Sequence, residues 1–394
     1  MRPFGPIVYR LGHKLFKLGS RVRLPVGSQM KILAIETSCD ETAVALLEIT
    51  GLRESPNVKI LGNSLFSQSH LHEQYGGVYP DLAKREHQKN LPILLEKTLK
   101  DSSTNNLQET INNIGYIAVT QGPGLEPALW TGITFAENLG KKWQKPVIPI
   151  DHMEGHIYSV LYQDKFSISN SQFSKLEMPA LALLVSGGHT ELVLVKNFGV
   201  YEILGKTRDD AVGEAFDKVA RMLGLSYPGG PKVSKLAEKG RTLNTDSQGP
   251  TLVFPRPMIN SNDFDFSYSG LKTAVLYWLQ KHPIKTEEDK ENVACAFEDA
   301  AVDVLVEKTR KALNQYSEVK TLILGGGVAA NTFLKKRLAD MLQEFPSVTL
   351  HTPQSELSTD NAIMIGLAAY IRIESGTTQE NQEIRARGNL ALGV

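Results

Sequence analysis

One pattern occurs twice in the chain: an apolar run, a polar loop of small residues, and a second apolar run. The first copy spans 31–49 around the loop 36–42, and the second spans 180–195 around the loop 186–190. Each copy predicts a β-hairpin that presents its loop at one end. A repeat at roughly 150 residues predicts two related halves whose loops face a shared cleft, although two unrelated hairpins would give the same pattern.

The remaining regular segments are typical of an α/β chain. Apolar runs at 116–120 and 321–324 end in glycine-rich turns, and residues 82–100 and 292–313 have the spacing of amphipathic helices. We place the boundary between the halves in the polar stretch 163–177. With 394 residues, the chain is also longer than one hydrophobic core usually organises.

Charge is distributed unevenly, although 43 basic and 43 acidic residues cancel. Residues 1–30 carry six basic residues and no acidic one, with apolar residues between them, so a helix there would be basic on one side and apolar on the other. This is the composition of a mitochondrial presequence, and a disordered basic tail is the alternative. Without residues 1–30 the chain has 37 basic and 43 acidic residues, a net charge of about −6. We therefore expect a mitochondrial matrix protein.

Two further features exclude classes of protein. The only cysteines, Cys39 and Cys295, cannot build a disulfide framework. No apolar run approaches the roughly 20 residues that a membrane-spanning helix needs, so we expect no membrane partner.

Four glycine-rich loops could approach a phosphate. They are Gly122-Pro123-Gly124, Ser186-Gly187-Gly188-His189, Gly325-Gly326-Gly327 and Tyr227-Pro228-Gly229-Gly230-Pro231. Successive backbone N–H groups in such loops form an anion-binding concavity, and a helix that starts after the loop adds its positive end. Any one of them is an ordinary turn just as well, but together they favour a nucleotide cleft between the halves.

His152 and His156 are four residues apart, which places them on one helical face within reach of one metal ion. Histidines paired without a metal are the alternative. A zinc protease needs Glu directly after the first His, but Met153 occupies that place and Glu154 would point around the helix. A third ligand must come from elsewhere. Asp360 is a candidate, and an N-cap of the following helix is its alternative role.

At these positions the chain resembles a known family. The matching segments are 35–42, 72–78, 122–125, 152–156, 185–190, 213–218, 227–231, 267–273, 325–331 and 359–362. In residue type and order they resemble the TsaD family, the tRNA threonylcarbamoyladenosine transferases, over about residues 31 to 372. His189 resembles the bacterial and organellar branch, and with the basic leader the resemblance is to a mitochondrial member.

The resemblance implies an actin-like ATPase (ASKHA) fold, with two duplicated α/β domains and the active site in the cleft between them. The expected ranges are 1–30 for the presequence, 31–170 for the first domain and 171–394 for the second. The implied reaction transfers a threonylcarbamoyl group from threonylcarbamoyl-AMP to N6 of the adenosine 3′ of the anticodon. The implied substrates are mitochondrial tRNAs that read ANN codons.

The resemblance also implies roles for individual residues. His152, His156 and Asp360 are the expected ligands of one divalent metal ion per subunit, Fe or Zn. Apart from the resemblance, the place of Glu41 at the end of the first hairpin loop makes it, with Asp40, our expected catalytic residue near the accepting amine, and an exposed loop acid is the alternative for Glu41. The expected nucleotide-binding set is Val185, Ser186, Gly187, Gly188, His189, Asp217, Gly230, Ser234 and Asn331. Pro127 and Trp130 depart from the small residues usual in the family, which leaves the shape of the 122–124 loop open.

The expected partners are tRNA, a separate synthase that supplies threonylcarbamoyl-AMP, and a second copy of the chain in a homodimer. ATP or AMP is a further expected occupant of the cleft. The tRNA surface is not visible in the sequence, and the basic candidates are Lys84-Arg85, Lys141-Lys142, Lys335-Lys336-Arg337, Arg385 and Arg387. Two other functions stay open at this point: a metal-dependent endopeptidase and a non-catalytic nucleotide-binding scaffold.

Overall fold

The computed structural model describes residues 8–11, 14–17, 29–102, 106–162, 176–243, 252–378 and 383–393. Two five-stranded sheets organise it, with strand orders β5-β4-β3-β6-β7 and β10-β9-β8-β11-β12. The strands are β3 (Met30–Glu36), β4 (Glu41–Leu52), β5 (Ser55–Ser67), β6 (Tyr116–Gly122), β7 (Val147–Asp151), β8 (Ala180–Val185), β9 (Thr190–Asn197), β10 (Val200–Lys206), β11 (Thr321–Gly325) and β12 (Thr349–His351).

The two sheets have the same topology. In each, the first three strands form an antiparallel meander, and the next two add in parallel beside the first strand. The β3–β4 and β8–β9 pairs are the two predicted hairpins. Their matching positions confirm a duplicated α/β architecture and rule out two unrelated hairpins. The third strand of each meander, β5 and β10, was not expected from the sequence.

Alternation along the central strands explains why both faces of each sheet are covered. In β8, Leu181 and Leu183 face a cluster with the outer helices, whereas Ala182 and Leu184 face a second cluster. That second cluster also contains Ala34 of β3, so it lies between the two sheets. Successive side chains of a strand point to opposite faces, and a sheet buried on both faces needs apolar residues at every position.

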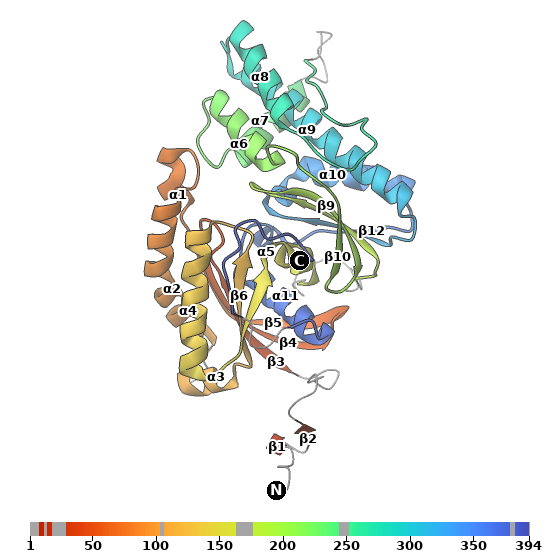
Figure 1. The fold of residues 1–394 in the computed structure, drawn as a ribbon. Coiled ribbons are helices and arrows are strands. Elements are labelled where there is room, and N and C mark those ends of the chain that lie inside the picture. The colour runs from red at the N-terminus through yellow and green to blue at the C-terminus, as the bar shows by residue number, and fades with distance from the viewer. Residues whose placement is uncertain are drawn as a thin grey trace.

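Helices form the outer layers and the layer between the sheets (Figure 1). On the first sheet, α2 (Pro80–Ser102) packs on β4 and β5, and α4 (Glu126–Trp143) packs on β6. The layer between the sheets contains α5 (His152–Tyr158) and α11 (Ala362–Ser375). The second domain adds α6 (Val212–Met222), α7 (Gly230–Leu243), α8 (Ser269–Lys281), α9 (Glu287–Gln315) and α10 (Thr332–Met341). Shorter elements are α1 (Ser69–His72), η1 (Glu73–Tyr75), α3 (Leu107–Asn113), η2 (Ser159–Leu161), η3 (Gly327–Ala330), η4 (Leu342–Glu344) and η5 (Ser355–Leu357).

The last helix returns to the first sheet. α11 contacts β3, β4, β6, β7 and α5, although the sequence-based range 171–394 groups it with the second domain. Its sequence is apolar almost all round, and its residues from Ala362 to Ile371 are buried, as expected of a helix enclosed between two layers. The return of the chain brings the residues just before α11 next to α5.

The N-terminal segment contains two short strands where the sequence predicted a helix. Val8–Leu11 and Lys14–Lys17 form strands β1 and β2, which pair antiparallel instead of forming the expected amphipathic helix. Glycine at position 12 disfavours a continuous helix there. The rest of the predicted presequence, 1–30, lies almost wholly outside the described residues. Within the part of the chain that the structure describes, no helix is both long and apolar enough to cross a membrane.

Candidate metal centre and nucleotide cleft

Two histidines and an aspartate meet between the two sheets. α5 begins directly after β7, and the side chain of Asp151 caps it by accepting a hydrogen bond of 2.8 Å from the N–H of Met153. Nε2 of His152 and Nε2 of His156 lie 3.2 and 3.3 Å from the same oxygen, Oδ1 of Asp360. The candidate ligand atoms all lie within 4.8 Å of one another. The spacing prediction for the histidine pair is therefore matched by convergent geometry.

The N-cap alternative for Asp360 is wrong. The residue that caps α11 is Asn361, whose side chain accepts a hydrogen bond of 2.9 Å from the N–H of Met364. Asp360 precedes the cap and directs its carboxylate to the histidines. Burial alone would raise the pKa of Asp360, but the neighbouring His152 and His156 hold it well below its usual range.

Glu36 supports His152 from the other ring nitrogen. Its Oε2 lies 3.2 Å from Nδ1 of His152, and the carboxylate is fully buried at the end of β3. It also accepts hydrogen bonds from the hydroxyl of Thr120 and the N–H of Ser38. A carboxylate behind an imidazole orients a metal-ligating histidine and raises its basicity. The sequence analysis gave Glu36 no role, although an acid directly after a buried strand was a usable signal.

The residues present fit a divalent cation. Both ring nitrogens of His156 are buried and, among the described residues, make no hydrogen bond of regular geometry, although Nε2 faces Oδ1 of Asp360 at 3.3 Å. Burial lowers the pKa of His156, which favours the neutral imidazole that binds metals. Two imidazoles and one carboxylate make a set that suits Zn or Fe and leaves further coordination positions for other ligands. The structure thus contains a possible His/Asp metal site.

Glu154, between the two histidines in sequence, points away from them. Its carboxylate accepts a hydrogen bond of 2.8 Å from the hydroxyl of Tyr201 and forms a salt bridge with Arg372 of α11. With only 2 % of its surface exposed, it has no access to a substrate at the metal centre. The general base of the zinc-protease arrangement is therefore absent from this helix.

The first hairpin loop lies beside the metal centre. Asp40 is buried at its end, and Glu41 begins β4, where its Oε1 accepts a hydrogen bond of 3.1 Å from the hydroxyl of Ser67. Burial, together with the neighbouring charges of Asp40 and Asp360, raises the pKa of Glu41 to about 10. Glu41 is thus a partly buried acid whose surroundings favour the protonated form, and not an exposed loop acid. Catalytic roles for Glu41 and Asp40 stay predictions.

The second hairpin loop reaches the same place from the other domain. Burial, with the neighbouring His152 and His156, lowers the pKa of His189 to about 4. The Ser186 hydroxyl accepts hydrogen bonds from the N–H groups of Gly188 and His189, at 3.3 and 3.1 Å. His189 of this loop therefore lies near enough to the two metal-site histidines for their charges to affect its pKa, and the loop begins at Val185, the buried end of β8.

The other predicted nucleotide residues surround α7 and the start of α10. Oδ1 of Asp217 accepts a hydrogen bond of 2.7 Å from the N–H of Gly229, and the following residue, Gly230, begins α7. Nδ2 of Asn331 lies 3.0 Å from the Ser234 hydroxyl and 2.7 Å from Oε1 of Glu298. Part of this set thus already takes part in protein hydrogen bonds, and its nucleotide role stays a prediction. Glu298, fully buried on α9, was missed by the sequence analysis.

Close backbone packing joins these loops. Gly326 has φ +90°, and a Cβ there would lie 2.4 Å from the Val185 carbonyl oxygen, so glycine is required. Pro127 lies in the first turn of α4, where a missing N–H removes no helical hydrogen bond, and Trp130 is 44 % exposed. Both departures from the family pattern are accommodated on α4.

Comparison with known proteins agrees with this geometry. Residues 59–367 match the family model described as TsaD: tRNA N6-adenosine threonylcarbamoyltransferase. The chain belongs to the TsaD family. It is 43 % identical over 352 residues to the tRNA N6-adenosine threonylcarbamoyltransferase of Thermosipho africanus, covering 89 % of this chain and 97 % of that protein. The corresponding TsaD relative of Persephonella marina is 44 % identical over 353 residues, covering 89 % of this chain and 92 % of the relative.

Structural similarity extends to a more distant protein. The crystal structure of HypF from T. kodakarensis superposes with a TM-score of 0.55 at 12 % identity, covering 90 % of this chain. The TsaD chain spans about half the length of that protein, 49 %. At this identity the similarity concerns the fold alone. By its family, this chain is an enzyme of the transferase class.

Proposed function

We propose that this protein transfers the threonylcarbamoyl group of threonylcarbamoyl-AMP to N6 of the adenosine 3′ of the anticodon in tRNA. One observation carries the proposal beyond family membership: the His152–His156–Asp360 cluster lies beside the loops of both duplicated hairpins, the polar loop 36–42 and the glycine-rich loop 186–190. Such an arrangement can hold an adenylate in one domain while the metal ligands of the other face its reactive end.

The reaction exchanges one bond to the carbamoyl carbon for another. The C–O bond to the phosphate of AMP breaks, the N6–C bond forms, and N6 loses one proton. The mixed anhydride already has a good leaving group, so positioning of the weakly nucleophilic amine supplies much of the rate. A metal ion held by His152, His156 and Asp360 would supply Lewis-acid polarisation at this point.

The side chains of the first loop would act on the carbonyl and the amine. The surroundings of Glu41 raise its pKa, and in its protonated form this acid would donate a hydrogen bond to the donor's carbonyl or phosphate oxygen. Asp40 is our candidate for accepting the N6 proton. The N–H groups of Gly187 and Gly188 would hold the phosphate of the adenylate, that of Gly188 in exchange for its hydrogen bond to the Ser186 hydroxyl, and Asp217 would hold the ribose.

The finer features of the function belong to the same proposal. We infer mitochondrial tRNAs reading ANN codons as substrates, a separate synthase as the source of the donor, a homodimer as the working form and the matrix as the location. The basic, acid-free composition of residues 1–30 supports the location. The metal is Fe or Zn, because both suit two imidazoles and a carboxylate.

Reconstitution tests the function. Purified protein, synthesised threonylcarbamoyl-AMP, a divalent metal and an ANN-reading tRNA are incubated, and modified adenosine is measured by mass spectrometry. We expect product with the wild type and none with His156→Ala. The matched control is His282→Ala, because His282 is an exposed histidine at the end of α8.

The outcomes separate the alternatives. No product from metal-replete wild type would contradict the transferase and leave a non-catalytic nucleotide-binding scaffold. Wild-type turnover in His156→Ala would contradict the metal role. Cleavage of a protein substrate by the wild type would be needed for an endopeptidase, which the buried ion pair of Glu154 disfavours.

A further inference from the structure

An exposed aromatic surface lies at the start of α2. The rings of Tyr75 and Tyr79 stack on each other, with centroids 5.2 Å apart and planes inclined by 23°. They are 55 % and 47 % exposed, respectively. Single exposed apolar side chains are common in folded proteins. Two tyrosines stacked together in solvent instead form a ready-made flat surface with free ring faces.

Hydrogen bonds connect this surface to the first hairpin loop. The backbone N–H of Tyr79 donates to Nδ1 of His72 at 3.2 Å, and Nε2 of His72 lies 3.3 Å from the side-chain oxygen of Gln68. The N–H of Gln68 in turn donates to the carbonyl oxygen of Asp40 at 2.9 Å. The tyrosine segment is thus held at a fixed place relative to the loop with Asp40 and Glu41.

The second domain contacts the same segment. The guanidinium of Arg221, on α6, donates a hydrogen bond to the carbonyl oxygen of Gly76. Gly76 has φ +66°, and a Cβ there would lie 2.6 Å from Arg221. Figure 1 shows α1, at the start of this segment, on the side of the first domain that faces α6. The tyrosines therefore lie where the two domains meet, beside the contact between Arg221 and Gly76.

We propose that Tyr75 and Tyr79 stack against an unpaired base of the RNA loop that carries the reacting adenosine. This inference rests on the proposed function and assigns part of its RNA-binding surface. Proteins recognise RNA loops chiefly by stacking splayed bases on aromatic side chains, because the bases of a paired helix are not accessible in this way. Two stacked rings next to the reactive loop are the matching arrangement.

Charge alone does not account for RNA binding here. Lys84 and Arg85 are exposed one turn into α2 and can contact phosphates, but Glu73 and Asp81, also exposed, lie on the same segment. The local charges therefore nearly cancel, so the aromatic surface supplies the attraction that the charges do not. It orients the loop so that its adenosine reaches the cleft.

The test uses the full-length protein and an RNA hairpin with the sequence of an ANN anticodon stem-loop. Binding is measured by fluorescence anisotropy for the wild type, Tyr75→Ala, Tyr79→Ala, Tyr75→Leu and Tyr75→Phe. We expect the Ala variants and Tyr75→Leu to bind roughly 5- to 150-fold more weakly, the range for loss of one base–aromatic stack. Tyr75→Phe, which keeps the ring, binds like the wild type.

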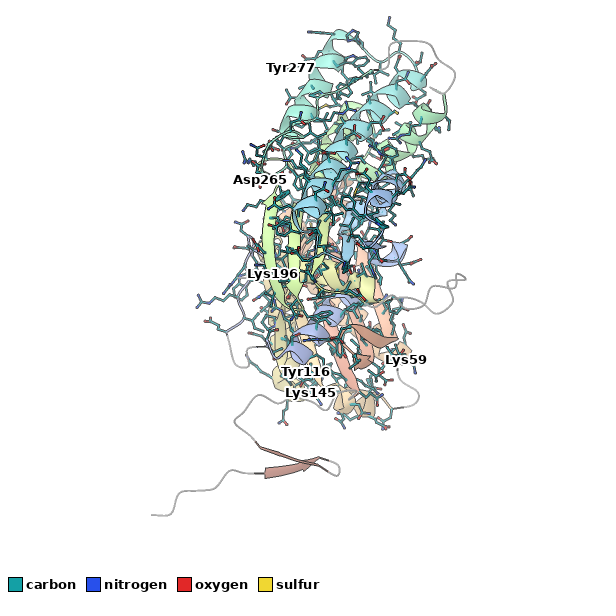
Figure 2. The ribbon with its side chains drawn as sticks, turned by 90° about the vertical axis from the view of Figure 1, so that its right-hand side faces the viewer. Lys59, Tyr116, Lys145, Lys196, Asp265 and Tyr277 are labelled. Atoms are coloured by element: carbon teal, nitrogen blue, oxygen red, sulfur yellow. The ribbon has the colours of Figure 1, made fainter. Side chains whose placement is uncertain are left out.

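The matched control is Tyr277→Ala. Tyr277 is 58 % exposed on α8, a helix that packs on α6 and α9 of the second domain, and it lies at the top of the molecule in Figure 2. This variant is expected to bind RNA like the wild type. A second readout is the KM for threonylcarbamoyl-AMP, which the tyrosine variants leave unchanged while they raise the KM for tRNA.

Failure of this inference differs from failure of the proposed function. RNA binding that depends on the tyrosines in a protein that forms no product supports the inference and contradicts the function. Product formation with unchanged RNA affinity in both Ala variants contradicts the inference alone. It is likewise contradicted if the Ala variants keep their RNA affinity but lose association between copies of the chain. Absence of RNA binding by the wild type contradicts both.

Discussion

Oε2 of Glu36 lies 3.2 Å from Nδ1 of His152, while the other nitrogen of the same ring lies 3.2 Å from Oδ1 of Asp360. The imidazole is thus held between two carboxylates that differ in setting. Glu36 is fully buried at the end of β3, whereas Asp360 borders the cleft. This order, carboxylate then imidazole then metal position, is that of a supported metal ligand.

Replacing Glu36 by Gln should weaken metal binding without unfolding the protein. The amide keeps the size of the side chain but removes the charge that orients His152, and such changes typically cost 10–100-fold in metal affinity or activity. Metal affinity is measured by competition with a chelator of known affinity. Glu48→Gln is the control, since Glu48 pairs with Lys31 on the same sheet, away from the histidines. Equal affinity of Glu36→Gln and wild type would contradict the support role.

Gly188→Ala should impair donor binding but not stability. An added Cβ would meet no atom within 4 Å, so the fold has room for it and the change in unfolding free energy stays within about 1 kcal/mol. A methyl group would nevertheless hinder a phosphate approaching the loop, so we expect the KM for threonylcarbamoyl-AMP to rise about tenfold, or ~1.4 kcal/mol.

The comparison variant for that prediction is Gly326→Ala. There the positive φ and the Val185 carbonyl at 2.4 Å from the added Cβ predict a loss of stability of about 1–3 kcal/mol or more. Chemical denaturation and steady-state kinetics distinguish the two variants. An unchanged KM in Gly188→Ala would argue against phosphate binding by this loop.

The sequence predicted those parts of the fold that depend on residues close together in the chain. The hairpins were predictable because an apolar strand and its neighbour lie next to each other along the chain. β10 was missed because it alternates exposed and partly buried residues at a sheet edge, so its apolar signal is weak. The placement of α11 on the first sheet was also missed, since an apolar helix does not reveal which sheet encloses it.

The site divides in the same way. His152 and His156 were predictable because helical periodicity alone puts them on one face. Asp360 was a candidate third ligand from its residue type alone, but its sequence context suited a helix cap equally well, and the family resemblance favoured the ligand role. Whether Asp360 or Asn361 caps the helix depends on a shift of one residue in where α11 begins, and only the tertiary fold determines that position. Glu36 acts through a contact with His152, far away in the sequence, and its only local signal is an acid at the end of an apolar run.

Stability of the metal-free protein should depend on His189 at mildly acidic pH. The pKa of this histidine falls from its ordinary 6.5 to about 4 in the fold, by burial and by the neighbouring histidines. Between these values the unfolded chain binds more protons than the folded one, so stability is full above about 6.5 and falls as the pH decreases towards 4. His189→Asn should therefore lose less unfolding free energy than the wild type between pH 7 and pH 5. Unfolding free energies are measured by chemical denaturation at both pH values. Equal losses in His189→Asn and the wild type would contradict this prediction.

Arg372 should stabilise the protein through its salt bridge to Glu154, since it neutralises a carboxylate with 3 % side-chain exposure. Arg372→Met leaves that charge buried and unpaired, which typically costs about 3–5 kcal/mol. Arg385→Met is the control, because the Arg385–Glu383 pair is mostly exposed and such pairs contribute roughly 0–1 kcal/mol. Unfolding in urea measures both variants.

A double variant distinguishes two effects of Arg372→Met: the loss of the Arg372–Glu154 salt bridge and the burial of an unpaired Glu154 carboxylate. In Glu154→Gln combined with Arg372→Met no charge is left buried, so the double variant should unfold at a higher urea concentration than Arg372→Met alone. Glu154 lies on α5 between the two histidines, so Arg372→Met should also weaken metal binding. The double variant should bind the metal more tightly than Arg372→Met. A double variant no more stable than Arg372→Met would mean that the hydrogen bond from Arg372 to the carbonyl of Pro149, and not its charge, holds α11 on α5.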